Sequence, residues 1–357
     1  MHDRNRLGPR LIPLVAKLVP FALDVLESQA RAGASAATAL ISGAYSTLEG
    51  LFSSVPTFIG GQLDKVFSAA LSPELMSLSH VKGASAAKAR AALLSAAAKK
   101  LPAKTLYPAI IRLHASLDGK QREPLLGLLD LLNRALRYGK TGDVGANYRA
   151  IFKLFLTVFD LRRVHATELD DEDVVVIEDN ALGAFVQFIL KLNEHMFRPL
   201  FLRTYDWAVI DLAEAGDAAS AGVADEGLVA RRTVLYKVVD RLLGQLRSIF
   251  VPYFSFMLDQ TVELLDAAAK GDLRDSDLWQ AVAGALAKAF EYDESGASFF
   301  FLSPCTLSRA SRIEADDVIA AAQVSGRARA WPSSLRPSRT SSRPPRPSSP
   351  SRPSIRS

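Results

Sequence analysis

The sequence is poor in the residues that build disulfide frameworks and metal centres. Its 357 residues include one cysteine, Cys305, which excludes an intramolecular disulfide and fits a reducing compartment such as the cytosol or nucleus. Its five histidines include no pair four residues apart, the spacing that places two imidazoles on one face of a helix. We therefore expect no zinc site, no other metal and no organic cofactor.

Motifs of known catalytic sites are also missing. The chain has no G-x-S-x-G elbow and no G-x-G-x-x-G, and Cys305 has no histidine near it in the sequence. Gly139-Lys140-Thr141 matches the end of a phosphate-binding loop, but Arg134 stands where that loop needs glycine. We interpret Gly139 as the C-terminal cap of the leucine-rich helix before it. We expect neither enzymatic activity nor a small-molecule substrate.

Long hydrophobic runs are absent, so no membrane contact is expected. The uncharged run Ala32 to Leu48 is rich in small and polar residues and slightly too short to span a bilayer, and the polar start Met1 to Arg10 does not resemble a secretory signal. Ser325 to Ser357 holds eight arginines and no acidic residue, so the formal charge of +5 minus these eight leaves −3 for the rest. Because the basicity belongs to this tail, charge does not indicate nucleic-acid binding by the body.

Helical periodicity covers most of the chain. Apolar residues recur at offsets of three and four in three clear stripes: Leu125, Leu128, Leu129, Leu132 and Leu136; Phe185, Phe188, Ile189, Leu192 and Met196; Leu235, Val238, Leu242, Leu246 and Phe250. The one strand-like stretch, Val174 to Ile177, is interpreted as the start of a helix that continues through Phe185. The sequence predicts an all-α protein of about a dozen helices with short connections.

The distribution of apolar residues favours stacked helical hairpins over a bundle. Ile151 to Leu161 (IFKLFLTVFDL) is apolar nearly all round, as expected for a helix with neighbours on both sides. Breaks that contain proline, such as FRPLFLRTY at 197–205 and FVPYFSFML at 250–258, are interpreted as starts of second helices of hairpins. We predict a HEAT-like α-solenoid of antiparallel hairpins.

We divide the chain into HEAT-like repeats at 1–180, a distinct helical domain at 181–295 and an irregular to disordered tail rich in Ser, Arg and Pro at 296–357. Within the second part, Ala213 to Gly227 is small and acidic and is interpreted as a solvated loop. The composition changes abruptly after Val324, so a second interpretation is that the tail is a product of the gene model and is unrelated to the fold.

Two segments carry candidate binding residues. His165 precedes a run of acids from Glu168 to Asp173, which allows a hard-cation site, but acids are also typical of a helix start, and we favour a solvated loop. The segment 190–208 mixes aromatic and basic residues as nucleic-acid surfaces do, yet its aromatics fit a helix-packing seam better. Arg198 and Arg203 are our candidates for contact with a partner's carboxylate or phosphate.

The same segment carries a family resemblance. Its strings are K-L-N-E-x-x-F-R-P-L-F at Lys191 to Phe201, D-W at Asp206-Trp207 and L-x-S-I-F-V-P-Y-F at Leu246 to Phe254. They resemble the C-terminal domain of the U-three small nucleolar RNA-associated protein ten family, whose animal members are called HEAT repeat-containing protein one. The resemblance covers roughly residues 10–295, with generic similarity at 44–71.

The resemblance implies a non-enzymatic scaffold of the small-subunit processome in the nucleolus. It implies roles in processing of the pre-18S ribosomal RNA and in ribosomal DNA transcription, with other processome proteins as partners and with U-three RNA and pre-ribosomal RNA held mainly through them. Family members are much longer, so the chain looks like a C-terminal fragment or a truncated gene model. The alternative is a generic protein-binding scaffold, similar to transport receptors or phosphatase scaffolds.

Overall fold

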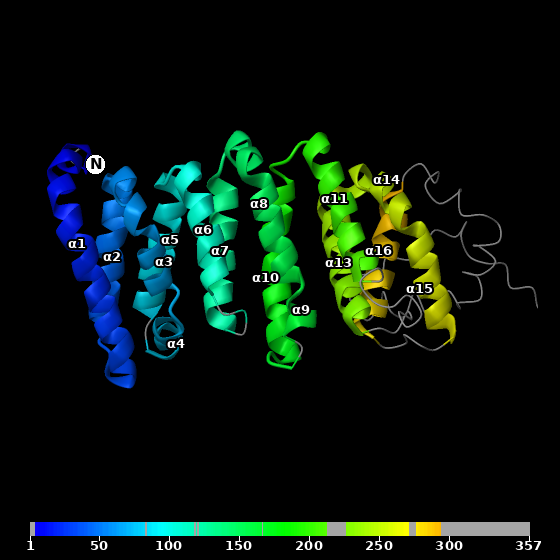
Figure 1. Ribbon diagram of the computed structural model, residues 1–357, viewed down its shortest axis with the longest axis horizontal. Helices are drawn as coiled ribbons and strands as arrows, with labels where there is room; N and C mark the ends of the chain where they lie inside the picture. The colour runs from blue at the N-terminus through cyan, green and yellow to red at the C-terminus, as the bar shows by residue number, and fades with distance from the viewer. Residues whose placement is uncertain are drawn as a thin grey trace, which may run out of the picture.

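The protein is a row of upright helices, which begins with the N-terminus at the left of Figure 1 and largely follows chain order, except that α16 lies between α13 and α15. The computed structural model describes residues 4–293 except 83, 118, 120, 166, 213–225 and 271–275. The first half of the row is made of α1 (Arg4–Ala32), α2 (Thr38–Ser54), α3 (Leu63–Ala70), α4 (Pro73–Lys82), α5 (Ala84–Lys100), α6 (Ala103–Ser116) and α7 (Arg122–Tyr138). The second half is made of α8 (Thr141–Phe159), α9 (Leu161–Val164), α10 (Asp171–Ile189), α11 (Glu194–Val209), α13 (Glu226–Leu246), α14 (Val251–Phe254), α15 (Leu258–Lys270) and α16 (Asp277–Tyr292).

Short 3₁₀ turns join several of these helices. They are η1 (Gly33–Ser35), η2 (Pro56–Phe58), η3 (Gly60–Gln62), η4 (Arg247–Ile249) and η5 (Ser255–Met257). Among the described residues there is no strand, and no helix there is long and apolar enough to cross a membrane.

The helices form two layers. In one layer α2, α5, α7, α10, α13 and α16 pack each against the next, and in the other α1, α3, α6, α8 and α11 do the same. Hairpin partners such as α1 with α2 and α6 with α7 join the layers, and each hairpin stacks mainly on its neighbours. This arrangement confirms the predicted all-α solenoid.

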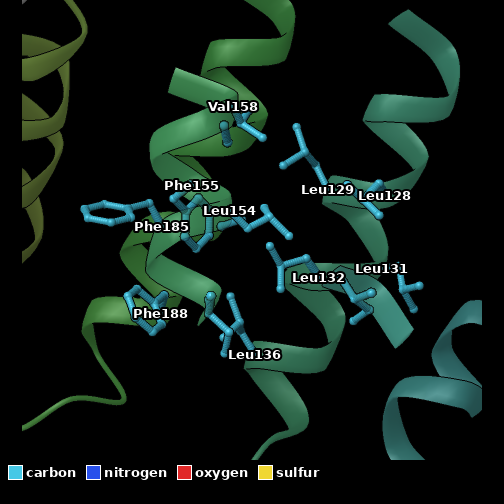
Figure 2. Packing of buried hydrophobic residues seen from close by; sticks show 14 of the residues in the cluster. Leu128, Leu129, Leu131, Leu132, Leu136, Leu154, Phe155, Val158, Phe185 and Phe188 are labelled. Atoms are coloured by element: carbon cyan, nitrogen blue, oxygen red, sulfur yellow. The ribbon is translucent and has the colours of Figure 1, made fainter. Parts of the chain in front are cut away.

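The core is continuous along the row. Figure 2 shows its middle, where leucines of α7 meet α8 and the phenylalanines of α10. All five leucines of the first predicted stripe are buried, and on α8 the side chains of Ile151, Leu154, Phe155 and Val158 are buried as well. Because α8 packs against α6, α10 and α11, its apolar side chains find neighbours on several sides, as its sequence predicts.

The N-terminus of α10 is capped by its own acidic residues. The Asp170 carboxylate accepts a hydrogen bond from the Asp173 backbone N–H at 2.7 Å, and this helix includes Val174 to Ile177, which confirms their helical interpretation. Acids in a first helical turn also interact favourably with the helix dipole.

Loss of this cap should destabilise the protein measurably. We expect Asp170→Ala to lower the free energy of unfolding by about 1 kcal/mol, because the Asp173 N–H then loses its acceptor. Denaturant titration followed by circular dichroism measures the change. Asp170→Asn keeps an acceptor and should cost less, and equal losses in both variants would contradict the capping role.

One expectation about proline is wrong. Pro199 does not begin a helix but lies inside α11, whose N-cap is Asn193, with its side chain accepting from the Met196 N–H at 3.0 Å. The helix continues through the proline because Phe197, Leu200 and Phe201 on either side of it are buried in the core. Pro252, in contrast, stands at the start of α14 as expected.

Gly139 caps α7, as the sequence predicts. Its N–H donates to the Ala135 carbonyl at 2.8 Å, and its own carbonyl accepts from Lys191 Nζ at 3.0 Å. A Cβ at this position would lie 2.5 Å from the Tyr107 hydroxyl oxygen, so a side chain has no room there. Close approach therefore explains the glycine.

The proposed domain division stays a prediction. Residue 180 lies inside α10, which packs against both α7 and α13. The 296–357 tail and Cys305 lie outside the described residues, as does the acidic segment up to residue 225, while Glu226 and Gly227 begin α13.

Candidate functional site

A groove opens between α8, α9 and α11, next to the C-terminal end of α6. Its volume is about 740 Å³. It is lined by His114, Ala115, Leu117, Gly119, Leu125, Phe152, Lys153, Leu156, Thr157, Asp160, Leu161, Val164, His165, Arg203 and Trp207. The size is within the range of sites that hold small ligands or peptide side chains.

The lining is mainly apolar and comes from helices distant in the sequence. Phe152 and Leu161 are buried, Leu156 is half-buried, and Val164 is 54% exposed. Trp207 of α11 also lines the groove and is itself buried. The exposed side chain of Val164 offers apolar surface to an incoming side chain.

Asp160, the acidic residue in the lining, is fully engaged by arginines. It accepts two hydrogen bonds from Arg231 at 2.8 and 2.9 Å and two from Arg163 at 2.9 and 2.6 Å. Burial alone would raise the pKa of the Asp160 carboxyl, but the hydrogen bonds and charges of these arginines outweigh it and lower the pKa. Asp160 therefore stays ionised and contributes no free negative charge to the groove.

Arg231 also holds the tryptophan in place. Its Nη1 donates to the Trp207 carbonyl at 2.9 Å, and its guanidinium lies 4.9 Å from the centre of the Trp207 ring. Arg231 is 8% exposed, so this cation–π contact and the pair with Asp160 are shielded from water. The wall of the groove is thus rigidly built.

The groove carries cationic groups at its rim. Lys153 is exposed, and no side-chain hydrogen bond or ion pair joins it to the described part of the chain. Arg203 is exposed and forms a two-pronged pair with Asp211 at 2.9 and 2.8 Å. Burial lowers the pKa of His114, which keeps that imidazole neutral at neutral pH. His165 Nδ1 lies 2.6 Å from Glu168.

Arg198, the second sequence candidate, faces another side of α11. Its guanidinium lies 6.0 Å from the centre of the Phe256 ring in η5, an exposed aromatic. The structure therefore does not bring Arg198 and Arg203 together, although one helix carries both. Their role in partner contact stays a prediction.

The aromatics of 190–208 form a packing seam, as favoured from the sequence. Phe197 and Phe201 pack against Phe250 and Tyr253 with ring centres 5.0 to 6.2 Å apart. Phe197 and Phe201 are buried, so their faces are not available for stacking on bases. The two family strings, FRPLF and FVPYF, thus meet in space.

Beside the groove, a buried ionic network ties α9 to α10, α13 and α16. Glu178 is 3% exposed and accepts from Arg162 at 2.8 and 3.1 Å and from Lys237 at 2.8 Å. Arg162 also pairs with Asp277 at 3.0 Å. Burial alone would raise the pKa of Glu178, yet Arg162 and Lys237 together lower it. The network fixes α9, and with it Val164, on the row of hairpins.

The acidic residues after His165 have structural partners. Asp170 caps α10, and Asp173 pairs with Arg122 at 3.0 Å. Within the described ranges no group of three or more His, Cys, Asp and Glu side chains has a metal-binding arrangement. Asp171 to Asp173 form the first turn of α10, so the run of acids lies at a helix start and not only in a solvated loop.

Sequence reasoning missed Lys153, Asp160, Val164 and the buried Arg231. A signal was present for the first two, because they interrupt the otherwise apolar run Ile151 to Leu161. Arg231 pairs with Asp160 across 71 positions, and no local pattern marks such a pairing.

The chain is similar to known proteins along most of its described length. The BP28CT (NUC211) domain matches residues 143–298, from within α8 to beyond α16. A protein of Mycosarcoma maydis named "U3 small nucleolar RNA-associated protein 10" is 32% identical over 81% of this chain, and a Schizosaccharomyces pombe protein of the same name is 28% identical over 87%. The "HEAT repeat-containing protein 1 homolog" of Dictyostelium discoideum is 23% identical over 72%.

The chain spans 13 to 17% of the length of these three relatives. The domain match includes the groove residues of α8, α9 and α11 and the meeting point of the FRPLF and FVPYF strings, but not the groove residues between 114 and 125. By these similarities the chain belongs to the U3 small nucleolar RNA-associated protein 10 family and carries its C-terminal domain.

Proposed function

We propose that the protein is a non-enzymatic scaffold subunit of the small-subunit processome. In this role it acts in the nucleolus, supports processing of the pre-18S ribosomal RNA and contributes to transcription of ribosomal DNA. The observation that carries the proposal is the similarity to relatives named as U3 small nucleolar RNA-associated over more than four-fifths of the chain.

The architecture supports a binding role. An α-solenoid exposes long surfaces and grooves between hairpins, which suit extended partners and other helical arrays. The charged clusters around the groove are engaged in pairs that hold helices together, such as Asp160 with Arg231 and Glu178 with Arg162. Their chemistry is that of structural ion pairs.

Affinity purification tests the proposal. The tagged chain is recovered from nuclear extract at moderate salt, and co-purifying proteins and RNA are identified by mass spectrometry and sequencing. We expect other processome subunits together with U3 small nucleolar RNA and pre-ribosomal RNA. Recovery of transport receptors or phosphatase subunits without nucleolar proteins would instead support the generic scaffold.

The proposal also implies that the protein associates with U3 RNA and pre-ribosomal RNA mainly through other processome proteins. Residues 1–324 carry a formal charge of −3, since the eight arginines of the tail account for more than the total of +5. We expect the purified chain lacking residues 325–357 not to shift U3 RNA in a gel at 150 mM salt, whereas the tail adds salt-sensitive, nonspecific binding at most. Specific binding of U3 RNA by the shortened chain would contradict the indirect mode.

A further inference from the structure

The groove exists because α8, α9 and α11 do not pack tightly against one another along their whole length. α8 packs more extensively against α6 than against α11, while α9 is held aside by Arg162 and its partners Glu178 and Asp277. At Gly119, after α6, the backbone approaches His165 so closely that a Cβ there would lie 2.7 Å from His165 Nε2. The opening is therefore built by specific contacts of the fold.

Charge in and around the groove is unbalanced toward positive. Asp160 is shared by the guanidinium groups of Arg163 and Arg231, and the positive charge left over is offset by the carboxylate of Glu168, which lies 2.6 Å from His165 in the lining. Lys153 is exposed and has no carboxylate partner within the described ranges, so one positive charge remains. Arg203 and Asp211 cancel each other. A partner with negative charge would meet complementary charge here.

We propose that this groove docks an acidic amphipathic helix of a partner protein. An aliphatic or aromatic side chain of that helix fills the space between Val164 and Trp207, and its flanking carboxylates reach Lys153 and Arg203. Arg203 can exchange Asp211 for the partner carboxylate, because its present pair is half exposed at 50% and 35%. The proposal rests on the scaffold function and names one surface through which it acts.

A peptide fits this surface better than RNA does. RNA backbones are followed by several spaced cations with exposed aromatic faces between them. Here the rings of Phe152 and Trp207 are only 6% and 5% exposed, and the exposed apolar side chain of the lining is the aliphatic Val164. Apolar anchors with flanking carboxylates are the pattern of helix-in-groove recognition.

Binding of a synthetic helix to the chain gives a direct test. The probe is a fluorescein-labelled peptide with leucine at helical spacing and glutamate on both flanks, followed by fluorescence anisotropy. We expect saturable binding that weakens as salt increases, and no binding of the same peptide with lysine in place of glutamate. A uridine oligonucleotide is the RNA probe, and its tighter binding at the groove would overturn the proposal.

Matched variants locate the binding. Lys153→Glu and Val164→Asp change exposed groove residues and should each weaken peptide binding about fivefold or more. Lys104→Glu on α6 and Val175→Asp on α10 make the same changes at exposed positions outside the groove and should leave binding unchanged. Equal effects in both sets would reject the groove as the site.

A photo-crosslinker placed at Thr157 gives a second measurement in nuclear extract. We expect the crosslinked partner peptide, once sequenced, to be acidic with aliphatic residues at helical spacing, and the crosslink to be lost with Val164→Asp. A crosslink to RNA, or none, overturns the groove proposal. If processome proteins still co-purify in that case, the scaffold function stands; if the peptide binds but nucleolar proteins do not co-purify, the scaffold function fails instead.

Discussion

Replacing Phe155 by alanine is expected to lower the free energy of unfolding by about 3 to 5 kcal/mol. The ring is 0% exposed, and its centre lies 6.0, 5.2 and 5.7 Å from those of Phe159, Phe185 and Phe188. Removing the ring leaves a cavity between α8 and α10, at the place shown in Figure 2. The surrounding side chains can fill this cavity only partly.

Phe21→Ala is the matched control. Its ring is 65% exposed on α1, so its loss should change stability by less than about 0.5 kcal/mol. Denaturant titration followed by circular dichroism gives both values. Similar losses in the two variants would contradict a packed aromatic seam between α8 and α10.

Amide hydrogen exchange shows which helices the Phe155→Ala substitution destabilises. Stacked hairpins contact mainly their neighbours, so opening can stay local. We expect Phe155→Ala to accelerate amide exchange most in α7, α8 and α10, which meet around the ring, and least in α1 and α2. Uniform acceleration along the row would mean that the array unfolds as one unit.

The fold could be predicted from the sequence because the patterns that indicate it are local. The leucine stripe of α7 and the all-round apolar surface of α8 follow from positions three and four apart, and both are buried as expected. Where local rules and burial compete, the sequence reading fails. Pro199 carries a helix-start signal, yet the buried residues beside it keep it within α11.

The candidate site was harder to predict from the sequence because its residues lie far apart along the chain. The groove combines Lys153 of α8, Val164 of α9 and Arg203 of α11, which no motif connects. Of the two arginines chosen from the sequence, Arg203 lines the groove and Arg198 does not. Both sit in one helix with similar neighbours in sequence, so only the packing of α11 against α8 separates their roles.

The ionic network beside the groove should be as important for stability as the aromatic seam. Glu178→Ala is expected to lower the free energy of unfolding by about 3 kcal/mol, because Arg162 and Lys237 then lose a buried partner. Asp179→Ala, at the next position, removes an exposed partner of Arg241 and should cost less than about 1 kcal/mol. Denaturant titration of the pair measures this contrast, and equal costs would contradict the buried network.

The pH dependence of stability distinguishes lost charge from lost packing at Glu178. Its pKa in the folded protein is lowered below the ordinary value of 4.5, because the hydrogen bonds and charges of Arg162 and Lys237 outweigh burial. The stability that its carboxylate contributes is therefore fully present above about pH 4.5 and is lost as the pH falls through the lowered pKa. Glu178→Ala should accordingly lose less stability than the unaltered chain between neutral pH and pH 3. Parallel pH profiles would show that alanine costs only packing, since the loss would then not depend on ionisation of the carboxyl.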